Sequence, residues 1–263
     1  MRYQKGSIGL HERKDKYILS FVTESRYVTH SQLLDFARTA FIESDRRVFN
    51  WRIRRLVHSR LVHKQVMPCL NGEALYSITN RGIQALERLG VYYMGANLER
   101  DKDASEFQLP HALELNEIRM ALMRTGLLSS WLPEPTIRVL NVSPATAYAK
   151  VYDGIATVCL DEEVVEFAVE YERTLKSQAK YGKIREAIES ENRLSVFLYL
   201  APTFELLRSL MNDFWDTKRL VFFGLADEFK KNVFLAPVTP AKYDRMLFRS
   251  ALLKATEFAK ARR

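Results

Sequence analysis

The chain has 263 residues, of which 47% are hydrophobic and 27% charged, as in globular proteins with room for one large or two ordinary domains. Its two cysteines form no CxxC pair, which excludes a disulfide framework and a cysteine-based zinc site. The sequence has no apolar run of about 18 residues and no signal-peptide core at its start, so we expect a cytoplasmic protein that does not enter membranes.

The positive charge is concentrated at one end of the chain. Residues 1–100 contain 17 Lys or Arg against 9 Asp or Glu, whereas residues 101–263 contain 23 of each. The formal net charge of +8 therefore belongs entirely to the first hundred residues. This asymmetry favours a polyanion-binding module joined to an electrically neutral domain.

The first ninety residues alternate between helix-like and strand-like patterns. Apolar residues at helical spacing predict four helices, and an Asn-Gly pair between two alternating stretches predicts a β-hairpin. The predicted elements are, in chain order, helix 15–25, helix 28–38, helix 44–61 capped by Ser44 or Asp45, strand 61–67, strand 75–79 and helix 80–90.

The third predicted helix and the strand after it form the most basic part of the chain. Residues 46–64 contain seven cations and no acid, whereas ordinary helix surfaces mix the two signs. Such a segment favours contact with double-stranded DNA over a merely solvated face. Trp51, inside the same segment, is expected in the core. The candidate DNA-binding residues are Arg46, Arg47, Arg52, Arg54, Arg55, Arg60 and Lys64.

Residues 94–108 are polar and unpatterned, which predicts a linker between a first domain, residues 1–93, and a second domain, residues 109–263. Strands flanked by helices predict an α/β sandwich for the second domain. Its predicted elements are helix 109–126, strand 136–142, a hairpin of strands 147–160 and 164–172 around the turn 161–163, helix 173–190, strand 193–201, helix 203–216, strand 218–226 and helix 242–263.

The predicted hairpin carries several acids on one face. Because side chains alternate along a strand, Glu170 and Glu172 share a face, and counting back from the turn sets Asp153 opposite residues 170–172. A slip of one residue, or a bulge at Gly154, would change which face Asp153 occupies. Three adjacent carboxylates repel one another and call for a cation, and their oxygens suit Mg²⁺ or Mn²⁺. A solvent-exposed acidic face is the alternative explanation.

The first domain resembles a known DNA-binding fold. The order helix, helix, arginine-rich helix, hairpin, helix and the phrase RRLVHSRLVHK…NGEALYSITNRGIQAL resemble a winged helix-turn-helix domain over residues 12–90. The resemblance implies that the third helix lies in the major groove of DNA and that the hairpin contacts phosphates.

The second domain resembles the core of the PD-(D/E)xK nucleases, which are restriction-endonuclease-like α/β domains. The resemblance implies that Asp153, Glu170 and Glu172 hold a metal ion that activates water for phosphodiester hydrolysis. Glu172 stands where the motif has a lysine, so Lys176 becomes the candidate for the missing positive charge. Further candidates, for which plain exposure is the alternative, are His111, Glu114 and Arg173.

The combination of a winged helix, a linker, LPHALELNEI and YDGIATV…EFAVEYERTLKSQAKY is similar to the replication-relaxation family and to plasmid mobilisation relaxases with a restriction-endonuclease-like domain. The similarity implies a DNA-binding protein of a mobile element that nicks or cleaves DNA. Its candidate partners are double-stranded DNA, other DNA-processing proteins of that element and a second copy of the chain in a homodimer. Two alternatives stay open. One is a non-catalytic DNA-binding regulator whose degenerate nuclease-like domain serves dimerisation or partner docking, and the other is a nuclease that cleaves transposon ends.

Overall fold

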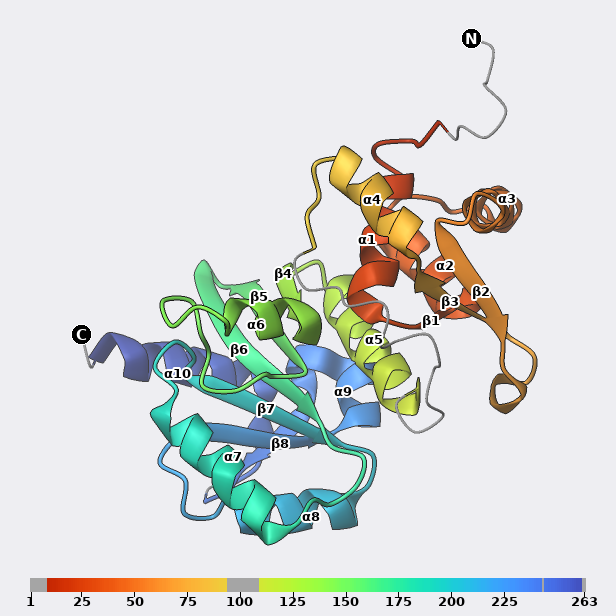
Figure 1. The fold of residues 1–263 in the computed structure, drawn as a ribbon. Helices are drawn as coiled ribbons and strands as arrows, with labels where there is room; N and C mark the ends of the chain where they lie inside the picture. Colours follow the sequence, from red (N-terminus) through yellow and green to blue (C-terminus); the bar gives the residue numbers. More distant parts are fainter. Residues whose placement is uncertain (1–8, 94–108, 243, 262–263) are drawn as a thin grey trace. The chain divides into compact units, whose positions relative to one another are not determined.

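The computed structural model describes residues 9–93, 109–242 and 244–261, which form a mixed α+β structure (Figure 1). The contacts between residues divide the chain into two compact units, Met1–Met120 and Ala121–Arg263. In the described residues, the first unit contains a three-stranded sheet and the second a seven-stranded sheet. No helix in this described part of the chain is long and apolar enough to cross a membrane.

The first unit contains the four predicted helices and the predicted hairpin in the expected order, together with a short strand β1 that was not predicted. It contains α1 (Asp15–Ser25), β1 (Val28–Thr29), α2 (His30–Thr39), α3 (Arg46–His58), β2 (Val62–Val66), the 3-10 turn η1 (Pro68–Leu70), β3 (Ala74–Ile78) and α4 (Asn80–Arg88). Thr29 and Gln32 form a capping box at the start of α2, and Asp45 caps α3 by accepting from the backbone N–H groups of Arg47 and Val48. These caps explain why both helices begin where they do.

α1 provides the centre of the first unit. Ile18 is fully buried, and the ring of Phe21 stacks on Phe36 of α2 with 3.9 Å between ring centroids. The strand order is β1-β3-β2, with both pairs antiparallel. A Cβ atom at Gly82 in α4 would lie 2.2 Å from the backbone oxygen of Leu61, so only glycine lets α4 approach the start of β2 this closely.

The beginning of α5 (Leu109–Arg124) belongs to the first unit. Leu109 is buried and packs with Tyr27, Met67 and Leu75, and the Asn116 amide donates to the Tyr27 carbonyl at 2.8 Å. The first unit therefore extends to Met120, beyond the domain end expected at residue 93. The linker predicted at 94–108 lies outside the described residues.

The second unit is built on one mixed sheet with the strand order β10-β9-β8-β7-β6-β5-β4. Strands β4 to β6 are antiparallel neighbours, whereas β6, β7 and β8 run parallel. Its elements are β4 (Leu128–Pro133), α6 (Glu134–Leu140), β5 (Gly154–Leu160), β6 (Glu163–Tyr171), α7 (Gln178–Ser190), β7 (Val196–Ala201), α8 (Phe204–Asp213), β8 (Leu220–Leu225), α9 (Ala226–Asn232), the 3-10 turn η3 (Val233–Leu235), β9 (Pro237–Pro240), β10 (Met246–Leu247) and α10 (Phe248–Ala261).

Helices cover both faces of this sheet. On one face, Tyr181 of α7 and Phe214 of α8 share a buried cluster with Ala168 of β6. On the other face, the ring of Phe167 meets that of Phe248 of α10 with 5.2 Å between centroids. Figure 1 shows α7 and α8 on the near side of the sheet and α10 on the far side. The face that carries Glu170 is therefore covered by helices instead of facing solvent.

Two predictions for the second unit are wrong in their local structure. Residues 136–142, expected as a strand, lie mostly in α6, because Pro135 suits the first turn of a helix and Ile137 is buried on one helical face. The helix expected from residue 173 begins at Gln178, which leaves Lys176 in the preceding segment instead of one turn inside the helix. The sequence also missed β4, α9, β9 and β10 in this unit and β1 in the first unit.

Candidate functional site

α3 has one face in the core of the first unit and one in solvent. Phe49, Ile53 and Leu56 are at most 2% exposed, and their spacing places them along the inner face of the helix. Trp51, expected in the core, is 58% exposed on the opposite face, so that prediction is wrong.

Two of the seven predicted DNA-binding cations are used inside the protein. The guanidinium of Arg52, which is 7% exposed, donates to Asp15 at 2.8 Å and lies 3.6 Å from Glu43. Arg55 forms an ion pair with the same carboxylate of Asp15, which is fully buried. Arg52 is therefore a structural residue. Arg55 also links α3 to α1 through Asp15, but its side chain is partly exposed.

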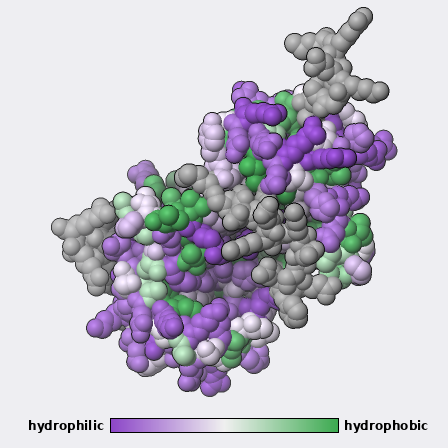
Figure 2. Space-filling model, in the orientation of Figure 1, coloured by the Kyte–Doolittle hydropathy of each residue, from purple (hydrophilic) through white to green (hydrophobic). Residues whose placement is uncertain are grey.

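The other five predicted cations are exposed. Among the described residues none of them forms a salt bridge, so their charges face solvent uncompensated. Figure 2 shows hydrophilic side chains gathered on the part of the first unit that contains α3. The five cations are Arg46, Arg47, Arg54, Arg60 and Lys64.

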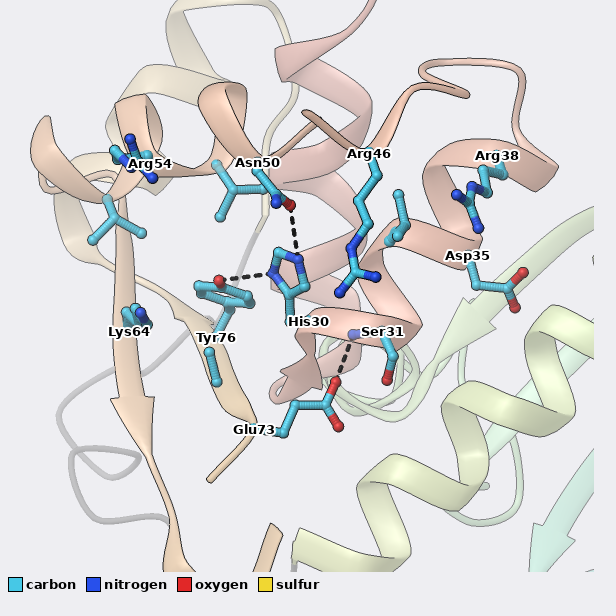
Figure 3. Close-up of a pocket in the computed structure, with 14 residues that line it drawn as sticks. His30, Ser31, Asp35, Arg38, Arg46, Asn50, Arg54, Lys64, Glu73 and Tyr76 are labelled. Carbon is cyan, nitrogen blue, oxygen red and sulfur yellow. Dashed lines mark hydrogen bonds between the residues drawn. The ribbon is translucent and has the colours of Figure 1, made fainter. Parts of the chain in front are cut away.

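A groove of about 740 Å³ lies between α2, α3 and the β2–β3 hairpin (Figure 3). Its apolar floor includes Leu34, Ile53 and Val57. Most of the charge around it is positive, and Arg38 is a cation that the sequence pattern did not single out. The charged residues that line the groove are Arg38, Arg46, Arg54, Lys64, Asp35 and Glu73.

A hydrogen-bonded network crosses the middle of the groove. His30, the first residue of α2, bonds Tyr76 of β3 through Nδ1 and Asn50 of α3 through Nε2, each at 3.0 Å (Figure 3). Burial lowers the pKa of His30, and the nearby charges of Arg46 and Lys64 act in the same direction. The neutral imidazole therefore ties together three elements of the groove.

The first unit should lose stability as pH falls through the range in which histidine titrates. In the unfolded chain His30 takes up a proton near pH 6.5, whereas in the folded protein its lowered pKa delays protonation. The free energy of unfolding should decline below about pH 6.5, and the decline should be smaller in His30→Gln. Urea unfolding at about pH 7.5 and about pH 5.5 measures this, with the exposed His63→Gln as control. Equal pH dependence in wild type and His30→Gln would contradict the assignment.

The predicted hairpin of the second unit has the register that the acidic pattern requires. β5 and β6 pair through a two-residue turn with Leu160 opposite Glu163 and Gly154 opposite Val169, without a bulge. Asp153 comes just before β5 and accepts a hydrogen bond from the backbone N–H of Tyr171 at 2.8 Å. Asp153 thus sits at the end of β6 that carries Glu170 and Glu172.

Both glutamates are buried and each is paired with a lysine. Glu170 is 7% exposed and Glu172 is 5% exposed, so neither belongs to a solvated acidic face. Lys150 forms an ion pair with Glu170, and Lys176 forms one with Glu172. Burial raises the pKa of Glu170 to about 7, and the neighbouring Asp153 adds to the rise although Lys150 opposes it.

A buried tyrosine lies next to these carboxylates. Tyr199 of β7 pairs with Glu170 across the parallel strands and is fully buried, and its hydroxyl has no hydrogen-bond partner among the residues that the structure describes. Burial and the charges of Glu170, Glu172 and Asp153 raise the pKa of Tyr199 well above its ordinary value.

The donor set fits a hard divalent cation in chemistry, because all three carboxylates supply oxygen. In residues 9–93, 109–242 and 244–261, however, no group of three or more His, Cys, Asp or Glu side chains is arranged to hold a metal ion. The ammonium groups of Lys150 and Lys176 occupy the glutamate oxygens instead. Metal binding would therefore require at least one of these lysines to release its glutamate.

The three remaining candidates lie in different places. His111 and Glu114 are half-buried on the part of α5 that belongs to the first unit. Arg173 is exposed and directly follows Glu172 in the second unit. Of these three, the structure places only Arg173 in the same unit as the carboxylates.

Sequence reasoning missed Lys150 and Tyr199. Lys150 lies in an irregular segment before β5, where strand alternation does not report which way a side chain points. Tyr199 belongs to the strand predicted at 193–201, and only the parallel pairing with β6 places it beside Glu170. A search for cations near the three acids in the sequence would have found Lys150, close to Asp153. It could not have shown that Lys150 forms an ion pair with Glu170.

Comparison of the chain with family models, with curated proteins and with solved structures finds no match. Two features of the chain indicate its class of protein. They are the groove of the first unit and the cluster of Asp153, Glu170, Glu172, Lys150 and Lys176 in the second unit.

Proposed function

We propose that this chain binds double-stranded DNA through its first unit and cleaves a phosphodiester bond of DNA in its second unit with the help of a divalent cation. The observation that carries the proposal is the groove of the first unit, where four exposed cations outnumber two acids on a concave surface between a helix and a hairpin. DNA offers a regular array of phosphates for such a surface.

The element order of the first unit supports a winged helix-turn-helix assignment. α1, β1, α2, α3, the β2–β3 hairpin and α4 follow one another as expected for that fold. In this assignment α3 enters the major groove, and the hairpin with Lys64 reaches the phosphate backbone. Arg46, Arg47 and Arg54 on α3 then contact phosphates or base edges.

The second unit supports the hydrolytic half of the proposal. The meander β4–β5–β6, followed by α7 and the parallel strand β7, has the order expected of a restriction-endonuclease-like core. Asp153, Glu170 and Glu172 would hold Mg²⁺ or Mn²⁺, which supplies a Lewis acid and lowers the pKa of a bound water molecule. Lys150 and Lys176 would then neutralise charge on the phosphate.

A second candidate is a DNA-binding protein without catalytic activity. The pairing of each buried glutamate with a lysine favours it, because the cluster is close to neutral without a metal ion. In that case the second unit serves as a dimerisation or docking domain. Cleavage of transposon ends would use the same chemistry as the first candidate and differ only in the DNA substrate.

The test is nicking of supercoiled plasmid in the presence of Mg²⁺. We expect nicking by the wild-type chain and none by Asp153→Ala, because loss of one carboxylate removes an oxygen ligand. Asp216→Ala, which removes an exposed acid of the same unit, serves as the control and should nick at the wild-type rate. A wild-type chain that binds DNA, fails to nick it and takes up no Mn²⁺ in calorimetry would select the non-catalytic candidate.

A further inference from the structure

Trp51 is an exposed indole in the middle of the most basic helix. Its side chain is 58% exposed, although burial of a tryptophan is normally one of the most favourable terms in a core. Neighbouring turns of α3 carry Arg47, Val48 and Arg54, all exposed, on the same side of the helix. The outer face of α3 thus has an apolar patch, formed by Val48 and Trp51, with the cations Arg47 and Arg54 beside it.

The orientation of this indole is restrained from inside the protein. The guanidinium of Arg55 lies over the Trp51 ring, with 5.3 Å between its central carbon and the ring centroid. Arg55 is itself fixed by the buried carboxylate of Asp15 and by the carbonyl of Gly9 at 3.2 Å. A side chain held in this way loses little conformational entropy when it meets a ligand.

From this arrangement we infer that Trp51 contacts bases in the major groove and favours thymine through its 5-methyl group. The inference rests on the proposed DNA binding of the first unit. Cations beside the indole draw in the phosphates, and the apolar ring then meets the apolar group that the major groove displays. Thymine is the only DNA base that presents a methyl group there.

The first part of the test measures contact. Tryptophan fluorescence is followed while duplex DNA, selected from a random pool with the wild-type chain, is added. We expect quenching in the wild type and in Trp215→Phe, and loss of most of the quenching in Trp51→Phe. Trp215 is the matched control, because it is 56% exposed and lies in the second unit.

The second part measures specificity. The selected duplex is compared with one in which uracil replaces thymine, which removes only the methyl groups. We expect the wild type to bind the thymine duplex several-fold to roughly tenfold more tightly, and Trp51→Ala to bind both about equally. Thermal unfolding of Trp51→Ala should match the wild type, since the side chain is exposed.

The outcomes separate the inference from the function on which it rests. Wild-type and Trp51→Ala chains that discriminate equally between the two duplexes would overturn the inference and leave DNA binding intact. A wild-type chain that enriches no duplex from the random pool, even at low salt, would overturn both. A preference for thymine that disappears only in the Trp51 variant supports it.

Discussion

Replacement of Asp15 by asparagine should lower the free energy of unfolding of the first unit by about 3–5 kcal/mol. Asp15 is fully buried at the start of α1, and its carboxylate pairs with both Arg52 and Arg55 of α3. Without that charge the nearly buried guanidinium of Arg52 keeps, within the described part of the chain, only the more distant Glu43 as an acidic partner. An uncompensated buried charge is among the most costly defects a core can carry.

Urea unfolding of the full chain, followed by circular dichroism, measures this loss. Glu87→Gln is the matched control, because it removes an equal charge from an exposed position on α4. The double variant Asp15→Asn/Arg52→Met should recover part of the stability, since it removes the stranded charge together with its partner. A single variant within about 1 kcal/mol of the wild type would show that the pairing does not hold α3 in place.

Removal of the two exposed arginines Arg47 and Arg54 should weaken DNA binding by roughly 10- to 100-fold and lower its salt dependence by about two phosphate contacts. Both side chains project from α3 without a salt bridge to any described residue, so their loss should not disturb the fold. Each cation that neutralises a phosphate releases counterions, and its loss removes that contribution.

Anisotropy of a labelled duplex, titrated at several salt concentrations, measures both quantities. The control is Arg88→Ala/Arg208→Ala, which lowers the net charge by the same amount at exposed positions outside the groove. If both double variants weaken binding equally, net charge alone attracts DNA, and the groove has no special role. A change confined to the α3 variant would place the DNA on that helix.

Arg52 and Arg55 show why the basic segment could be recognised but not sorted. Composition alone reveals seven cations without an acid in residues 46–64. Their partner, Asp15, lies 37 residues before Arg52 and belongs to a different helix. Helical periodicity places Arg52 on the inner side of α3 with Phe49 and Ile53. It cannot show that the buried carboxylate of Asp15 lies within hydrogen-bond distance of Arg52.

The acidic hairpin shows the same limit in the second unit. Alternation along the strand predicted that Glu170 and Glu172 share a face; in the structure Glu170 pairs with Tyr199 of β7, and the backbone N–H of Glu172 continues the ladder by donating to the carbonyl of Leu200 at 2.9 Å. Whether that face is wet or covered depends on α7 and α8, which follow later in the chain. A period of two assigns side chains to faces and carries no information about what packs against them.

The sequence by itself determined the four helices and the hairpin of the first unit, the start of α3 at Ser44 or Asp45, the pairing of the acidic hairpin around its turn and the concentration of positive charge in the first hundred residues. These properties depend on neighbours in the chain, through hydrogen-bond spacing, turn chemistry and composition. Only the tertiary structure decided that Asp15 forms ion pairs with two arginines and that Trp51 is exposed to solvent. It also decided that Lys150 forms an ion pair with Glu170 and that Tyr199 lies beside Glu170 on the neighbouring strand. Those outcomes depend on contacts between residues far apart in the chain, which exist only once the core has formed.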